Sequence, residues 1–302
     1  MDMQTTLWII FWVLITSAFF ADLIILGRHK KGINIKEAGK LIAVWISLAL
    51  IFGVLIFALL GQEKALEYFT GYAVEYSLSI DNMFVIIMIF SFFKITPQYQ
   101  HKVLIYGILG AVFLRFLFIF AGIKFINSFS WAIYVFGAIL LWTSIKMFAG
   151  GKEEGGIENN KAFKILKKVF PLKPDIKSGD FFERENGVLY ATPLFAAVIV
   201  IEASDIIFAV DSIPAVLSIT TDSFIVYSSN IFAVLGLRSL YFMLAGLADR
   251  FQFLRYGVAL ILFFVGAKML LSHYYHISSF TSLALILSIL AASIIISVKK
   301  TK

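Results

Sequence analysis

Residues 190–219 read YATPLFAAVIVIEASDIIFAVDSIPAVLSI, an apolar run long enough to cross a bilayer that nevertheless carries three carboxylates. These acids are Glu202, Asp205 and Asp211. A charged side chain at the centre of a membrane helix costs about 2.5–3.5 kcal/mol on insertion scales. Acids at this depth therefore indicate a helix that faces the interior of a bundle and a binding site for a cation.

A second apolar run repeats this arrangement. Within residues 67–93, Glu75 and Asp81 stand six residues apart, the same spacing that separates the two aspartates of the first run. An amide or a hydroxyl follows the second acid in each run, as Asn82 or as Ser212. Two matching acid clusters at membrane depth strengthen the prediction of a cation site.

The whole chain has the composition of a membrane protein. It has 302 residues, of which 60% are hydrophobic and 15% charged, and its mean hydropathy is +0.91. A soluble domain of this length cannot bury so large an apolar fraction. We therefore predict an all-α, multi-pass membrane protein with a single transmembrane domain over residues 1–302. Its nine predicted transmembrane helices are 7–26, 41–60, 67–93, 102–123, 129–149, 190–219, 224–248, 255–272 and 279–298.

Basic residues are distributed unevenly between alternate loops. Twenty of the 26 Lys and Arg lie in the loops and tail on one side, whereas only Lys64 and Lys124 lie in loops on the other. The positive-inside rule therefore predicts an external N-terminus and a cytoplasmic C-terminus in the inner or plasma membrane of a cell. The net charge of +7 follows from this topology, so the expected partner is the lipid bilayer and not a nucleic acid.

The order of the charged residues predicts an inverted repeat. Residues 67–149 (repeat A) and 190–272 (repeat B) each contain an acid pair, an arginine one helix later and a lysine one helix after that. The arginines are Arg115 and Arg238. Because each unit has three helices, the second copy must enter the bilayer from the opposite face. Secondary transporters with this architecture hold their substrate near the midplane, where the copies meet.

Five acids and two arginines lie deep in the predicted helices, which leaves three uncompensated negative charges. Lys146 and Lys268 lie close to helix ends, where their side chains are expected to extend to the interface. A divalent cation, with or without a proton, would neutralise most of the excess. The candidate donors beside the acids carry oxygen, and the chain has no cysteine. Hard oxygen ligands suit Mn²⁺, Mg²⁺ or Ca²⁺ as a transported substrate, and no resident cofactor is expected.

Four further residues are accessory candidates. Ser79 and Ser212 stand near the acids. Asp22, near the cytoplasmic end of the first predicted helix, is interpreted either as a proton or access site or as the partner of a nearby basic residue. Asn230, near the outer end of the seventh, is either a ligand or a hydrogen-bonding link between helices.

Helix geometry alone does not aim each acid pair at one point, because residues six apart differ by about 120° around a helix. Pro214 removes the hydrogen bond to the carbonyl of Val210, so we expect the helix to kink or break at Asp211 and to free carbonyls for the site. Repeat A has no such proline, and a break there would depend on Gly71 and nearby serines.

Residues 150–189 separate the two repeats. They are rich in Gly, Lys, Glu and Asn and contain Pro171 and Pro174. This composition predicts a hydrophilic cytoplasmic loop with one short basic helix near residues 162–170. The loop is also the segment through which protein partners are expected to bind, if any do.

Four segments resemble the signature sequences of the TerC (TerC/Alx-type) family of integral membrane proteins. They are EYSLSIDNMFV from Glu75, ATPL from Ala191, IEASDIIFAVDSIPA from Ile201 and SNIFAVLGLRSLYF from Ser229. The resemblance implies manganese export or homeostasis, and the family is named for tellurium resistance. By motif position it assigns metal binding to Glu75, Asp81, Asn82, Glu202, Asp205 and Asp211, with Arg115 and Arg238 as charge partners.

Export of a divalent cation, Mn²⁺ first and by proton antiport, is the leading prediction. One alternative is a membrane scaffold that delivers metal to other proteins or helps them mature. Another is a tellurite-resistance determinant, although excess negative charge would repel an oxyanion. An enzyme is not expected, because an intramembrane aspartyl protease needs a Gly-x-Gly-Asp motif that neither Asp81 nor Asp211 has.

Overall fold

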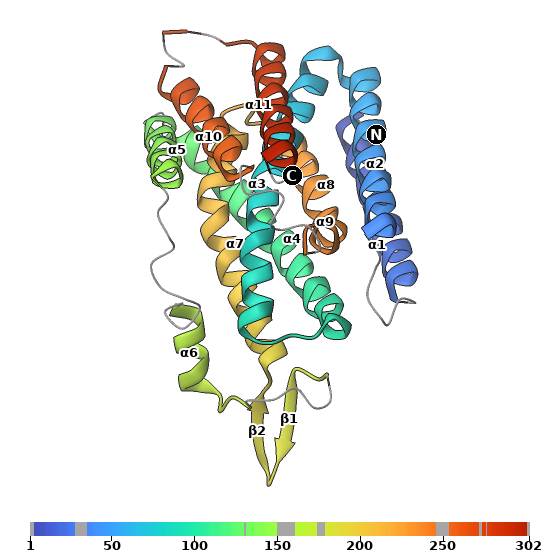
Figure 1. Cartoon of the computed structure of the whole chain (residues 1–302). Coiled ribbons are helices and arrows are strands. Elements are labelled where there is room, and N and C mark those ends of the chain that lie inside the picture. The colour runs from blue at the N-terminus through green and yellow to red at the C-terminus, as the bar shows by residue number, and fades with distance from the viewer. Residues whose placement is uncertain are drawn as a thin grey trace.

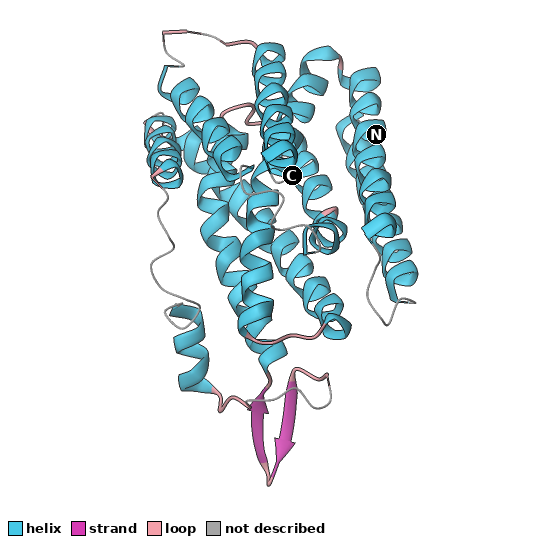
Figure 2. Ribbon diagram, in the orientation of Figure 1, coloured by secondary structure: helices cyan, strands magenta, loops and turns pink. Residues whose placement is uncertain are grey.

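The computed structural model of the chain describes residues 3–27, 35–129, 131–149, 161–173, 179–245, 254–271, 274–275 and 277–300. The described part is a helical bundle, and its one sheet is a two-stranded hairpin that projects from one end (Figures 1 and 2). The prediction of an all-α multi-pass membrane protein is confirmed.

Apolar helices account for each predicted crossing. Seven stretches of the described chain are long and apolar enough to cross a membrane, and α8 and α9 together form one of them. Two shorter apolar helices, α5 and α10, cover the remaining predicted ranges. The helices are α1 (Met3–Gly27), α2 (Ile35–Leu60), α3 (Gln62–Phe92), α4 (Pro97–Ser128), α5 (Ala132–Phe148), α6 (Lys161–Val169), α7 (Pro193–Leu217), α8 (Ser223–Leu235), α9 (Leu237–Ala245), α10 (Leu254–Leu271) and α11 (Ser279–Lys300).

The helices of the two predicted repeats pack crosswise. Helix α3 packs against α8, α4 packs against α7, and α5 packs against α10. A two-fold axis between the repeats would exchange the first two of these pairings and would map the third onto itself. This packing is compatible with a two-fold relation between the two units, and the inverted repeat itself stays a prediction.

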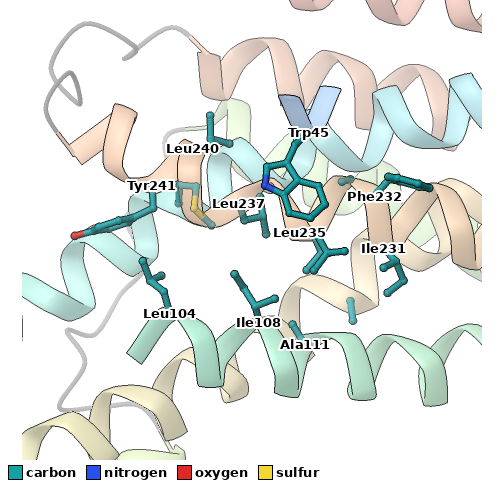
Figure 3. Packing of buried hydrophobic residues seen from close by; sticks show 14 of the residues in the cluster. Trp45, Leu104, Ile108, Ala111, Ile231, Phe232, Leu235, Leu237, Leu240 and Tyr241 are labelled. Atoms are coloured by element: carbon teal, nitrogen blue, oxygen red, sulfur yellow. The ribbon is translucent and has the colours of Figure 1, made fainter. Parts of the chain in front are cut away.

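Helix α8 lies at the centre of the bundle, with every side chain from Phe224 to Leu235 buried. Aromatic side chains of α1 and α2 cover it: the rings of Phe52 and Phe232 lie 5.0 Å apart, and those of Trp8 and Phe224 also lie 5.0 Å apart. Figure 3 shows Trp45 of α2 on one side of the α8–α9 junction and side chains of α4 on the other. Helices α1 and α2, which belong to neither predicted repeat, thus cover the central helix on this side.

The predicted break at Asp211 is wrong. Helix α7 continues through Pro214 and ends three residues later, at Leu217. Because the side chains on both sides of the proline are buried, packing outweighs the loss of one hydrogen bond. The interruption lies instead in the next helix, at Gly236 between α8 and α9.

The loop between the repeats contains both the predicted short basic helix, α6, and an unpredicted hairpin of β1 (Phe182–Glu185) and β2 (Val188–Ala191). Asn186 and Gly187 both have positive φ, at 50° and 83°, which is the backbone of a tight hairpin turn. Lys173 Nζ contacts Glu183 at 2.7 Å and Glu185 at 3.0 Å, and these hydrogen bonds raise the pKa of Lys173. The hairpin is therefore held by ion pairs to the segment that joins it to α6.

Candidate cation-binding site

Four helices meet at the guanidinium of Arg115, which is completely buried on α4. Its Nη1 donates to Glu75 Oε1 of α3, and its Nη2 donates to Asp205 Oδ1 of α7 at 3.3 Å. Nη1 also donates to Asn230 Oδ1 of α8 at 2.6 Å. One arginine therefore holds an acid from each predicted repeat, and Glu75 and Asp205 are the residues that the repeat alignment pairs.

Glu75 is saturated with hydrogen-bond donors. Besides Arg115, its Oε1 accepts from Ser79 Oγ at 3.3 Å, and its Oε2 accepts from Asn230 Nδ2 at 2.9 Å. All four side chains are buried. Glu75 therefore serves as an anchor for Arg115.

Glu202 and Asp205 carry buried oxygens to which no side chain in the described part of the chain donates a hydrogen bond. Both carboxylate oxygens of Glu202 and Oδ2 of Asp205 are buried without a hydrogen-bond partner among the described residues. Leaving such a group unmet in a low-dielectric interior is costly unless it is protonated or binds a cation. These three oxygens are the free acceptors of the site.

Glycines of α4 make room for the Glu202 carboxylate. A Cβ on Gly110 would collide with the carboxylate carbon and with both of its oxygens, and a Cβ on Gly107 would lie 3.9 Å from Oε1. Helix α4 can therefore approach α7 closely, and the carboxylate of Glu202 packs against the backbone of α4 at Gly110. Sequence analysis missed this contact, because glycine spacing on α4 has meaning only once the helix opposite is known.

A small cavity of about 40 Å³ is lined in part by Asp205. Its polar lining comes from Asn82, Ser204, Asp205 and Arg238, and Met83 is among its apolar neighbours. At least about 10–15 Å³ of such space is needed for one water, so this cavity can hold a water or one small ion. The Ser204 hydroxyl donates to the carbonyl of Val200 within α7.

The remaining candidates divide into two groups. Ser212 is buried on α7 with no hydrogen-bond partner for its hydroxyl in the described chain, and Arg238 is buried in the first turn of α9. Asp81, Asp211 and Asp22 belong to α3, α7 and α1, but their side chains lie outside the described part. Among the side chains that are described, no group of three or more His, Asp or Glu is close enough to hold a metal ion.

Lys268 links two helices. Its ammonium donates at 3.0 Å to Ser282 Oγ, in the first turn of α11, and so connects α10 to α11. In the described part of the chain, the carboxylates of Glu75 and Asp205 pair with Arg115, and the carboxylate oxygens of Glu202 have no hydrogen-bond partner. The arrangement can accept positive charge and has no evident use for an anion.

Comparison with known proteins agrees with this architecture. The model of the integral membrane protein TerC family matches residues 60–302. The Alx protein of Escherichia coli (strain K12), provisionally named a membrane-bound redox modulator, is 43% identical over 300 residues, which cover 96% of this chain and 94% of that protein. An uncharacterized membrane protein of Rickettsia bellii is 40% identical over 291 residues, 96% of each chain. No solved structure matches significantly. The chain belongs to the TerC family of integral membrane proteins.

Proposed function

We propose that this protein exports a divalent metal cation, Mn²⁺ first, through a carboxylate site in the middle of the membrane. The observation that supports the proposal is the set of carboxylate oxygens of Glu202 and Asp205 on α7 that are buried without a hydrogen-bond partner among the described residues. Asp205 also lines the small, largely apolar cavity. These oxygens have no hydrogen-bond donor among the described residues to offset their burial. A hard dication meets both their charge and their chemistry.

In the proposed cycle, Arg115 and the metal ion compete for Asp205. The Arg115–Asp205 contact of 3.3 Å is longer than the other hydrogen bonds of Arg115, so Asp205 is the partner more readily given up. A dication bound between Asp205 Oδ2 and Glu202 would recruit Asn82 and the neighbouring Asp81 and Asp211. Protons that leave these acids on binding would supply the counter-transport.

We propose Mn²⁺ as the transported ion, ahead of Mg²⁺ and Ca²⁺, because of the residues that line the cavity. Carboxylate, amide and hydroxyl oxygens accept all three ions. Met83 brings a polarisable thioether to the same cavity, and a sulfur neighbour favours the transition-metal ion. We also propose that the protein lies in the plasma membrane with its N-terminus outside, an orientation that the uneven distribution of basic residues between alternate loops supports.

Redox activity, which the name of the Alx relatives suggests, is a weaker candidate. The chain has no cysteine, so it cannot exchange disulfides or bind iron–sulfur clusters through thiolates.

A scaffold role would rely on the hairpin, whose Val188 and Leu189 are exposed. Deleting residues 179–191 while measuring metal flux separates the roles, because a pure transporter tolerates loss of partner binding.

The deciding experiment is Mn²⁺ uptake into lipid vesicles reconstituted with the purified full chain. Uptake is measured through the molecules whose cytoplasmic side faces outward. We expect Glu202→Gln and Asp205→Asn to lower the initial rate by at least about tenfold, because each removes a charge from the ion, and tenfold in rate corresponds to about 1.4 kcal/mol. Glu63→Gln is the matched control, since Glu63 is an exposed acid in the first turn of α3. Wild-type rates in both site variants would refute the proposed site.

Proton coupling has its own test in the same vesicles. An imposed pH gradient, acidic inside, should accelerate Mn²⁺ uptake by the wild-type chain, because outward proton flow would drive the exchange. Insensitivity of the flux to the gradient would remove antiport but would leave metal transport in place. Cellular Mn²⁺ content with Asp81→Asn and Asp211→Asn extends the test to the acids outside the described part.

A further inference from the structure

Helix α6 has a composition unlike any other helix of the chain. Its nine residues, KAFKILKKV, include four lysines and no acid. Phe163 and Leu166 are buried on one strip of the helix, while Lys164, Lys167 and Lys168 are exposed on another. This is a basic amphipathic helix attached to a membrane protein.

The buried strip fixes the depth of α6 relative to the membrane. The ring of Phe163 packs edge-on against Phe92 and Phe93, with centroids 6.0 and 5.3 Å apart, at the last residue and the cap of α3. Phe170, just after α6, lies 6.4 Å from Phe195 in the first turn of α7. Because α3 and α7 are both membrane-spanning stretches, α6 stands where two spans leave the hydrocarbon.

A second apolar strip on α6 faces away from the bundle. Ile165 is 61% exposed and Val169 is 63% exposed, and residues four apart lie one above the other on a helix. Figure 1 shows α6 at the outer edge of the bundle, beside the lower part of α7 and below α5. The exposed apolar side chains and the lysines of α6 are thus not covered by the described part of the bundle.

We propose that α6 binds the anionic phospholipid headgroups of the surrounding leaflet. Lys164, Lys167 and Lys168 contact the lipid phosphates, while Ile165 and Val169 rest against the upper acyl chains. Clustered lysines on an amphipathic helix complement the negative surface of a membrane leaflet, and lysine stems can lie along apolar surface with the ammonium in the headgroup layer. The ammonium of Lys167, 4.8 Å from the centre of the Phe163 ring, already lies over apolar surface in this way.

The absence of cysteine from the chain allows a local test. Ile165→Cys, labelled with an environment-sensitive fluorophore, is reconstituted as the full chain in vesicles of phosphatidylcholine, with or without phosphatidylglycerol, that contain lipids quenching at headgroup depth. We expect phosphatidylglycerol to shift the emission to the blue and to increase quenching. The triple variant K164Q/K167Q/K168Q should require at least about tenfold more anionic lipid for the same change.

Matched controls separate this surface from general charge effects. K36Q/K40Q/K94Q removes three basic charges from the same side of the membrane but not from α6, and it should retain the full response. A label at Val188→Cys on the hairpin should stay unquenched. High salt should abolish the fluorescence response of the labelled chain that keeps all its lysines, because salt screens their attraction to the headgroups. This measurement does not depend on the folding of a lysine variant.

Three outcomes would overturn the proposal. The label at residue 165 could remain accessible to a water-soluble quencher in every lipid mixture, which would assign the face to a protein partner. Inorganic phosphate could reproduce the response without anionic lipid. The triple variant, with unchanged circular dichroism, could respond as the parent does. None of these results depends on metal transport, so the test stands apart from the proposed function.

Discussion

At the residue scale, Asn230 completes the charge network around Arg115. Its amide accepts from Arg115 and donates to Glu75, so one neutral side chain fixes the orientation of both ions. Asn230→Leu keeps the branched shape and the number of side-chain heavy atoms but removes both hydrogen bonds. We expect it to lower the free energy of unfolding by roughly 2 kcal/mol, because a buried charged acceptor loses a donor. Unfolding in mixed micelles would measure this.

Ser228→Ala is the control for that substitution. Ser228 is buried on the same helix, but its hydroxyl donates only to a carbonyl of that helix, that of Ile225 at 3.3 Å. Its removal should change stability by less than about 0.5 kcal/mol, as expected for a hydrogen bond that leaves no ion unmet. Equal losses in the two variants would show that Asn230 contributes by packing alone.

At the scale of elements, the approach of α4 to α7 depends on Gly110. Gly110→Ala would drive a methyl group into the carboxylate of Glu202, which must then leave its seat. Alanine is intrinsically better than glycine within a helix by about 1 kcal/mol, so a loss of stability or transport would come from the collision. We expect Mn²⁺ transport to fall by at least about tenfold, measured in the vesicle assay.

Gly39→Ala on α2 isolates the helix-propensity effect. No atom lies within 4 Å of a Cβ built there, so this substitution should leave transport unchanged and stability equal or slightly higher. If Gly110→Ala behaved in the same way, the Glu202 carboxylate would have to move without consequence, and its position against α4 would have no functional role.

At the scale of the whole molecule, the topology can be read with single cysteines. Tyr274, between α10 and α11, is 78% exposed and is predicted to be external, whereas Glu185 of β1 is 57% exposed and predicted to be cytoplasmic. A membrane-impermeant maleimide should label Tyr274→Cys in intact cells and Glu185→Cys only after permeabilisation. The reverse pattern would invert the orientation deduced from the basic loops.

The membrane class and the positions of the apolar helices could be predicted from the sequence because they depend on local quantities. Hydrophobic length is set by bilayer thickness, and loop charge is read by the positive-inside rule, so neither needs knowledge of packing. The hairpin also had a local signal in Asn186-Gly187, which sequence analysis overlooked. Pro214 was misread because proline near a helix end costs only one hydrogen bond, which buried neighbours can offset.

The acids themselves were determined by the sequence: buried charge in an apolar run marks a site wherever the helices lie. Which acids are neutralised and which keep free oxygens was decided only by the tertiary structure. Arg115 could have paired with any of them, and its choice of Glu75 and Asp205 follows from the crossing of α3, α4, α7 and α8. Partnership between charges depends on distances across helices, and these distances are fixed by packing and not by the order of residues in the chain.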